Sequence, residues 1–199
     1  MLTPELYKHY FSLGISYADY IKNFENELNA EPNIPYHEYL PMNWQRTNRV
    51  YKTTTVLPEI FNALKKLKEP LNWLLISENW CGDASQIVPV IAKIANENEE
   101  KINLKIVYRD KNLELMDAHL TGTSRSIPML IQLNRQFNVT GTWGPRPKLA
   151  QELVKRLKSN EETSQNYQEE IHKWYASDKQ TSVQTELLVL LNQSMLITA

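Results

Sequence analysis

The stretch NWCGDASQ, residues 79–86, contains the only cysteine of this 199-residue chain, Cys81. It follows LNWLLIS (71–77), a nearly continuous apolar run with the composition of a strand buried on both faces. Residues 84–98 return to helical spacing, and Pro89 is expected to kink that helix. The sequence therefore predicts Cys81 at the junction between a buried strand and a helix.

A cysteine at the start of a helix is favoured as a thiolate. The unpaired backbone N–H groups and the positive end of the helix dipole stabilise an anion there. A thiol in that position can have a pKa well below about 8.5, and only the thiolate attacks disulfides. The alternative is that Cys81 acts as a small buried hydrophobic residue, and its position alone leaves both interpretations open.

The elements around this junction alternate between strands and helices. After the first strand and helix, the pattern predicts a strand over 102–108, a short helix over 112–120, strands over 129–134 and 137–143, and a helix over 149–157. Only Arg135 and Gln136 separate the last two strands, which predicts a tight antiparallel hairpin at an edge of the sheet. The predicted order is β-α-β-α-β-β-α.

Helices are expected on both sides of this region. Apolar spacing indicates a long helix between Thr3 and Leu28 that Gly14 interrupts, and helices over 36–51 and 57–67. Two more are indicated around 167–175 and 183–191. We expect one domain, 1–199, with a helical N-terminal extension (1–70), a core (71–158) and C-terminal helices (159–199).

Charge and composition argue against several classes of partner. Twenty-two basic and 23 acidic residues give a net charge of −1, so neither nucleic acid nor a membrane is an expected partner. The first ten residues are too polar for a signal peptide, and one cysteine forms no internal disulfide, so we expect a soluble cytoplasmic protein. The four histidines lack metal-ligand spacing; no metal and no cofactor are expected.

Three stretches together resemble the thioredoxin-like superfamily. WCGDA (80–84) occupies the place of that family's W-C-G-P-C, and SIPMLIQL (126–133) is similar to its cis-proline loop and following strand. WGPRPKL (143–149) resembles the turn that closes its substrate groove. The resemblance covers about residues 71–158 and implies an α/β thioredoxin-like fold with a central mixed sheet of about four strands. More narrowly, the chain looks like a bacterial group with helical extensions and a monothiol CGDA motif.

The resemblance also implies a set of site residues. Cys81 would be the catalytic nucleophile, and Pro128 would follow a cis peptide bond. The substrate groove would be formed by Trp80, Gly82, Asp83, Ala84, Ile127, Pro128, Trp143 and Gly144. Asp83 would repel a thiolate, and Arg125 would offset that repulsion if the fold brings it close, although a solvated loop arginine is the ordinary alternative.

Two departures from the family limit the chemistry. Ala84 stands where a dithiol enzyme has its resolving cysteine, and Leu75 stands where thioredoxins have a buried acid. Dithiol disulfide reduction is therefore excluded, because a mixed disulfide at Cys81 could be released only by an outside thiol. The leading hypothesis is a monothiol oxidoreductase whose partners are protein disulfides or low-molecular-weight thiols. A non-catalytic peptide-binding module and a thiol oxidant sensor are the alternatives.

The N-terminal extension offers further candidates. Tyr36, Tyr39 and Trp44 could cover the sheet, shape a pocket near the sulfur or support a dimer, and the sequence does not choose among these. Arg46 and Arg49 lie three residues apart on a predicted helix and could bind a phosphate or carboxylate, with a solvated helix face as the ordinary alternative.

Overall fold

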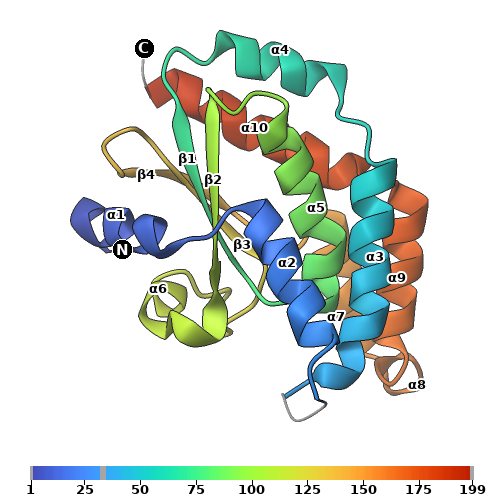
Figure 1. Ribbon diagram of the computed structural model, residues 1–199. Helices are drawn as coiled ribbons and strands as arrows, with labels where there is room; N and C mark the ends of the chain where they lie inside the picture. The colour runs from blue at the N-terminus through green and yellow to red at the C-terminus, as the bar shows by residue number, and fades with distance from the viewer. Residues whose placement is uncertain (1, 32–34, 198–199) are drawn as a thin grey trace.

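The computed structural model describes residues 2–31 and 35–197. Its centre is a four-stranded sheet of order β2-β1-β3-β4, made of β1 (Leu71–Ser77), β2 (Ile102–Tyr108), β3 (Met129–Leu133) and β4 (Val139–Trp143). β1 runs parallel to β2 and antiparallel to β3, and β3 pairs with β4 as an antiparallel hairpin. The predicted α/β class and order of elements are confirmed (Figure 1).

Helices enclose the sheet. The described helical segments that precede it are α1 (Pro4–Leu13), α2 (Tyr17–Leu28), η1 (His37–Tyr39), α3 (Leu40–Thr53) and α4 (Pro58–Lys66). The core contains α5 (Gly82–Asn96), η2 (Arg109–Lys111), α6 (Leu113–Asp117) and α7 (Lys148–Lys158), and α8 (Glu161–Ser164), α9 (Tyr167–Asp178) and α10 (Thr181–Ile197) follow. In Figure 1, α3 packs beside α5, while α10 crosses the sheet along β4 and reaches α4.

The first predicted helix is two helices. Ser16 begins α2 by accepting a hydrogen bond from the Asp19 N–H at 3.1 Å, and Gly14 ends α1 in an extended conformation. Between them, Ile15 exchanges two backbone hydrogen bonds of 2.9 Å with Ile106 of β2. A Cβ on Gly14 would lie 2.7 Å from the Lys105 Cβ, so the chain approaches the sheet edge too closely for a side chain.

The core is centred on β1. Trp73, Leu74, Leu75 and Ile76 are all fully buried, which matches the apolar run in the sequence. The Trp73 indole donates to Gln132 Oε1 at 3.1 Å, and the Gln132 amide donates to the Leu190 carbonyl at 3.1 Å. These buried hydrogen bonds connect β1, β3 and α10.

The predicted two-residue turn of the hairpin is wrong. β3 ends at Leu133 and β4 begins at Val139, so a longer loop joins the strands. The Asn134 side chain organises that loop by accepting hydrogen bonds from the N–H groups of Gln136 and Asn138 at 2.9 and 3.0 Å. Phe137 has a positive φ of 62° in this loop. A positive φ is uncommon for a bulky residue, so the sequence does not predict it.

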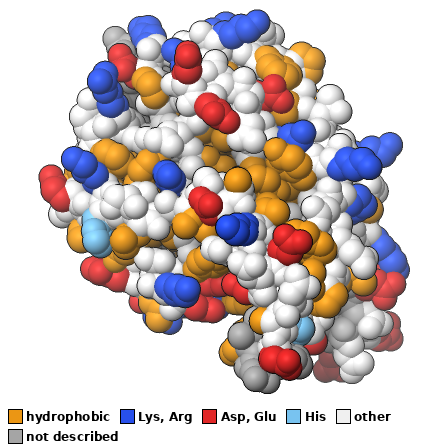
Figure 2. Space-filling view, viewed as in Figure 1, with side chains coloured by type: hydrophobic (Ala, Val, Ile, Leu, Met, Phe, Trp, Pro, Cys, Tyr) orange, Lys and Arg blue, Asp and Glu red, His pale blue; other side chains and the backbone are white. Residues whose placement is uncertain are grey.

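Charges of both signs are spread over the face of the molecule that Figure 2 shows. On the face shown in Figure 2, Lys and Arg side chains alternate with Asp and Glu, and hydrophobic side chains lie between them. Among the described helices, none combines the length and apolar character needed to cross a membrane.

Candidate functional site

Cys81 lies at the junction that the sequence predicts. It follows the end of β1 and is the N-cap residue of α5, with its carbonyl accepting from the Ser85 N–H at 3.2 Å. Its own N–H donates to the Glu78 carbonyl at 3.3 Å. The sulfur is therefore held at the start of a long helix, close to backbone N–H groups.

Of the two interpretations that the sequence leaves open for Cys81, burial and electrostatics favour the buried, protonated thiol. Cys81 is only 8 % exposed, and its Sγ donates to the Ile127 carbonyl at 3.5 Å. Burial, and to a smaller extent the Asp83 carboxylate, raise the pKa of the Cys81 thiol to about 12. The N–H groups of Ala84 and Asp83 oppose this increase, but they do not offset the loss of hydration.

Asp83 is bound by groups from two distant segments. Arg146 Nε donates to Asp83 Oδ1 at 2.8 Å and Arg146 Nη2 donates to Oδ2, so the pair is bidentate. The Tyr175 hydroxyl of α9 donates to the same Oδ1 at 2.9 Å. Sequence reasoning missed both partners, because they lie 63 and 92 residues beyond Asp83 in the chain.

The cation near the sulfur is Arg146 and not Arg125. Arg125 forms a bidentate ion pair with Asp117 at 2.6 and 2.8 Å, and both side chains are about half exposed. Arg146, by contrast, lowers the pKa of Cys81, although less than burial and Asp83 raise it. The Asp117 carboxylate thus binds the Arg125 guanidinium, and a role of Arg125 as the thiolate partner stays a prediction.

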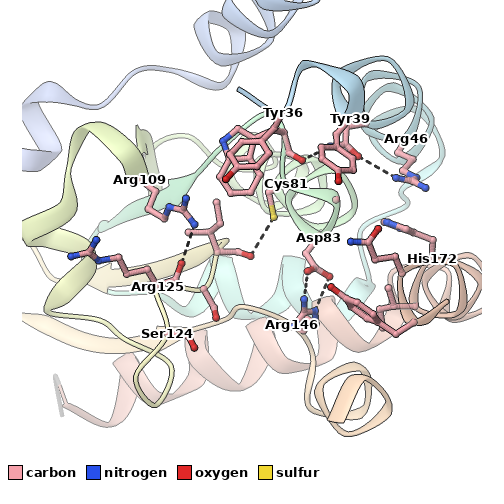
Figure 3. Close-up of a pocket in the computed structure, with 18 of the residues that line it drawn as sticks. Tyr36, Tyr39, Arg46, Cys81, Asp83, Arg109, Ser124, Arg125, Arg146 and His172 are labelled. Atoms are coloured by element: carbon pink, nitrogen blue, oxygen red, sulfur yellow. Dashed lines mark hydrogen bonds and ion pairs between the residues drawn. The ribbon is translucent and has the colours of Figure 1, made fainter. Parts of the chain in front are cut away.

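A pocket of about 1270 Å³ lies over Cys81 (Figure 3). One wall is the N-terminal extension, with Tyr36, Tyr39 and Arg46. The other walls are the start of α5, the loop before Pro128 and helix α9, from which His172 projects. The pocket is therefore shaped by the core together with both helical extensions.

Aromatic rings cover the side of the pocket nearest the sulfur. Tyr36 packs against Trp80 with ring centroids 4.8 Å apart, and the Arg109 guanidinium lies 4.7 Å from the Trp80 ring. Tyr39 is next to Tyr36. Of the roles that the sequence leaves open for Tyr36, Tyr39 and Trp44, the two tyrosines shape the pocket near the sulfur. Trp44 instead packs on Phe24, with ring centroids 5.3 Å apart.

The predicted groove residues divide into two groups. Those in the pocket wall with Cys81 are Trp80, Gly82, Asp83 and Ile127. Those outside this wall are Ala84, Pro128, Trp143 and Gly144. Ala84 is buried behind the wall, and the Trp143 indole donates to Glu186 of α10 at 2.7 Å, so it faces the C-terminal helix.

Pro128 and Gly144 lie against each other. The Ile127–Pro128 peptide bond is cis, and Gly144 has a φ of 134°. A Cβ on Gly144 would clash with the Pro128 carbonyl oxygen, so only glycine fits this approach. The loop that carries Ile127 is thereby fixed beside the sulfur.

The described part of the chain contains no cluster of three or more His, Cys, Asp or Glu side chains that could bind a metal ion. His119 is buried and bonded to the Tyr7 hydroxyl at 2.8 Å, and burial lowers the pKa of His119 to about 4. Its imidazole is therefore a neutral hydrogen-bonding group of the core at pH 7.

The mixed sheet and the cysteine at the end of its first strand, facing an Ile-Pro loop, define a protein of the thioredoxin-like class. A family model described as Thioredoxin matches residues 29–158, which is more than half of the chain. The chain therefore belongs to the thioredoxin family.

Two solved structures are similar over nearly the whole chain. A protein of unknown function from Pseudomonas aeruginosa has a TM-score of 0.68 and 14 % identity, with 98 % of this chain and 99 % of that chain covered. A crystal structure of an HIV epitope-scaffold has a TM-score of 0.63 and 14 % identity, with coverages of 94 % and 97 %. Both show the shared fold, and the search of curated proteins found no match.

Proposed function

We propose that this chain is a thioredoxin-fold binding protein whose pocket holds an extended peptide over a protonated Cys81. The observation that carries this proposal is the pocket of about 1270 Å³ with Cys81 in its wall as a buried thiol. With a pKa of about 12, only about one thiol in 10⁵ is ionised at pH 7. Binding does not depend on that small fraction, whereas nucleophilic attack does.

The size and lining of the pocket support a peptide. Small-molecule sites usually enclose about 300–1000 Å³, and this pocket is larger. Its aromatic side chains, Tyr36, Tyr39 and Trp80, suit apolar groups, and the backbone of the loop before Pro128 suits an extended chain. Because its walls come from all three segments, we also propose that residues 1–199 form one domain.

A selection from a displayed random-peptide library tests this function. Met42 is 52 % exposed and lines the pocket, so Met42→Trp should block it, whereas Leu149 is 59 % exposed on α7 and lies outside its wall. We expect peptides selected on the wild-type protein to bind Cys81→Ser and Leu149→Trp normally and to lose at least tenfold in affinity for Met42→Trp. The proposal would be contradicted if the selection enriched no peptide, or if the enriched peptides bound Met42→Trp with the same affinity as the wild-type protein.

Monothiol exchange is the second candidate, because Cys81 lines the pocket and the chain belongs to the thioredoxin family. In that reaction the Cys81 thiolate would attack a substrate disulfide, form a mixed disulfide and release a substrate thiolate. A second thiol from the low-molecular-weight pool would then reduce Cys81. This role fits a monothiol CGDA subgroup that acts in the cytoplasm, and it requires that Cys81→Ser abolish function.

A further inference from the structure

Arg46 is a cation of the pocket wall, and no carboxylate within the described residues forms an ion pair with it. It projects from α3, and its Nη1 donates to Asn43 Oδ1 at 3.1 Å. The other guanidinium groups of the wall are each paired with a carboxylate: Arg146 with Asp83, Arg125 with Asp117, and Arg109 with Asp110. None of the ion pairs in residues 2–31 and 35–197 includes Arg46.

A buried asparagine fixes the position of Arg46. Asn43 is only 1 % exposed, and its amide donates to the carbonyls of Asn79 and Trp80 at 3.2 and 2.9 Å. These carbonyls belong to the loop that leads into Cys81. The guanidinium of Arg46 is therefore held in a defined position relative to that loop by a side chain that has its own hydrogen bonds.

His172 adds a second donor to the same wall. Its Nδ1 accepts a hydrogen bond from the Gln86 amide at 3.2 Å, so the proton of the neutral imidazole is on Nε2. A Cβ on Gly82 would lie 3.0 Å from that Nε2. Burial, with the neighbouring charge of Arg46, lowers the pKa of His172 to about 4, so Nε2–H remains a neutral donor at pH 7.

The charges around Arg46 favour an anion. Burial and the like charge of Arg49 lower the pKa of Arg46, so the protonated guanidinium lacks both full hydration and a counterion. Of the remaining carboxylates in the wall, Glu169 is paired with Lys173 at 2.9 Å, and Glu38 forms no ion pair within the described chain. A ligand carboxylate would supply the counterion that the protein does not.

We propose that Arg46 and His172 form the carboxylate-binding end of the pocket, so that the preferred ligand is a peptide with an acidic side chain or a free C-terminal carboxylate. The planar guanidinium matches a carboxylate with two parallel hydrogen bonds. Figure 3 shows both side chains on the same side of Cys81, away from Arg109 and Arg125. This inference rests on the peptide-binding function proposed above.

A synthetic array of random hexapeptides tests the preference for carboxylates. The array is made in two forms, one with a free C-terminal carboxylate and one with a C-terminal amide. We expect wild-type protein to bind peptides that contain Asp, Glu or a terminal carboxylate at least tenfold more tightly than their Asn, Gln or amide counterparts. Comparison of the two forms shows which source of carboxylate is used. Arg46→Gln should remove this preference while neutral peptides keep their affinity, and Arg46→Lys should restore part of it.

Arg49→Gln is the matched control, because Arg49 is on the same helix and outside the pocket wall. It should keep the preference for acidic peptides, and thermal unfolding should confirm that each variant is folded. Two results would overturn this inference and leave the binding function standing. In the first, Met42→Trp blocks binding but wild-type protein shows no preference for carboxylates. In the second, Arg46→Gln keeps the preference for carboxylates. No binding by any peptide would overturn both.

Discussion

At the residue scale, burial controls the acid groups near the end of β1. Glu78 is 8 % exposed, and its Oε1 accepts from the Asp110 N–H at 2.8 Å. Burial raises the pKa of Glu78 to about 7, although that hydrogen bond lowers it. Cys81, three residues later, has its pKa raised for the same reason. The helix dipole that favours a thiolate is real, but in this loop dehydration is the larger effect.

Glu78 gives the stability a defined pH dependence. Because its pKa is higher in the folded state than the ordinary 4.5, its contribution is complete below pH 4.5 and is lost as the pH rises through about 7. We expect the wild-type protein to lose on the order of 3 kcal/mol of unfolding free energy relative to Glu78→Gln across this range. Urea denaturation at a series of pH values measures this difference, with exposed Glu97→Gln as the control. Parallel curves for wild type and Glu78→Gln would contradict the assignment.

At the scale of elements, α10 holds the end of the hairpin against the next helix. Glu186 of α10 accepts from the Trp143 indole of β4 at 2.7 Å and from the Lys148 N–H of α7 at 2.8 Å. One carboxylate thus joins β4, α7 and α10, and it satisfies an N–H group in the first turn of α7. This arrangement turns Trp143 away from the pocket and toward the C-terminal extension.

Replacement of Glu186 by glutamine should loosen this junction. The amide keeps the size of the side chain but offers a single acceptor oxygen to two donors, so we expect a loss of about 1–3 kcal/mol in unfolding free energy. Chemical denaturation measures the loss, and Glu152→Gln, on the exposed face of α7, serves as the control with no expected change. A Glu186→Gln protein as stable as wild type would show that α10 is held by apolar packing alone.

Most elements of the core could be predicted from the sequence, and several contacts of the site could not. The bounds of β1 and β2 follow from a continuous apolar run and from alternation in the sequence, and the apolar run of β1 matches the burial of that strand. Arg146 and His172 were missed because only the folded chain brings α9 and the turn after β4 to the start of α5. The sequence left the burial of Cys81 open as an alternative, because the position of Cys81 along the chain does not show which segments pack over the sulfur.

At the scale of the whole molecule, the helical segments on both sides of the core contribute walls to the pocket over Cys81. The N-terminal segment contributes Tyr36, Tyr39 and Arg46, and α9 contributes His172, while the core contributes the sulfur and the loop before Pro128. The extension also pairs with the free edge of β2 through Ile15, which covers part of that edge. The site is thus formed by the core together with the helical segments on both sides of it.

The protonation state of Cys81 in the pocket can be measured from its rate of alkylation. We expect the rate constant for iodoacetamide on the folded wild-type protein to rise about tenfold per pH unit from pH 7 to 10 without a plateau, as a pKa of about 12 requires. In the unfolded protein in urea, the rate constant should instead reach half of its maximum at about pH 8.5 and level off above that pH. A plateau in the folded protein with an apparent pKa at or below about 8.5 would contradict the account and favour monothiol exchange.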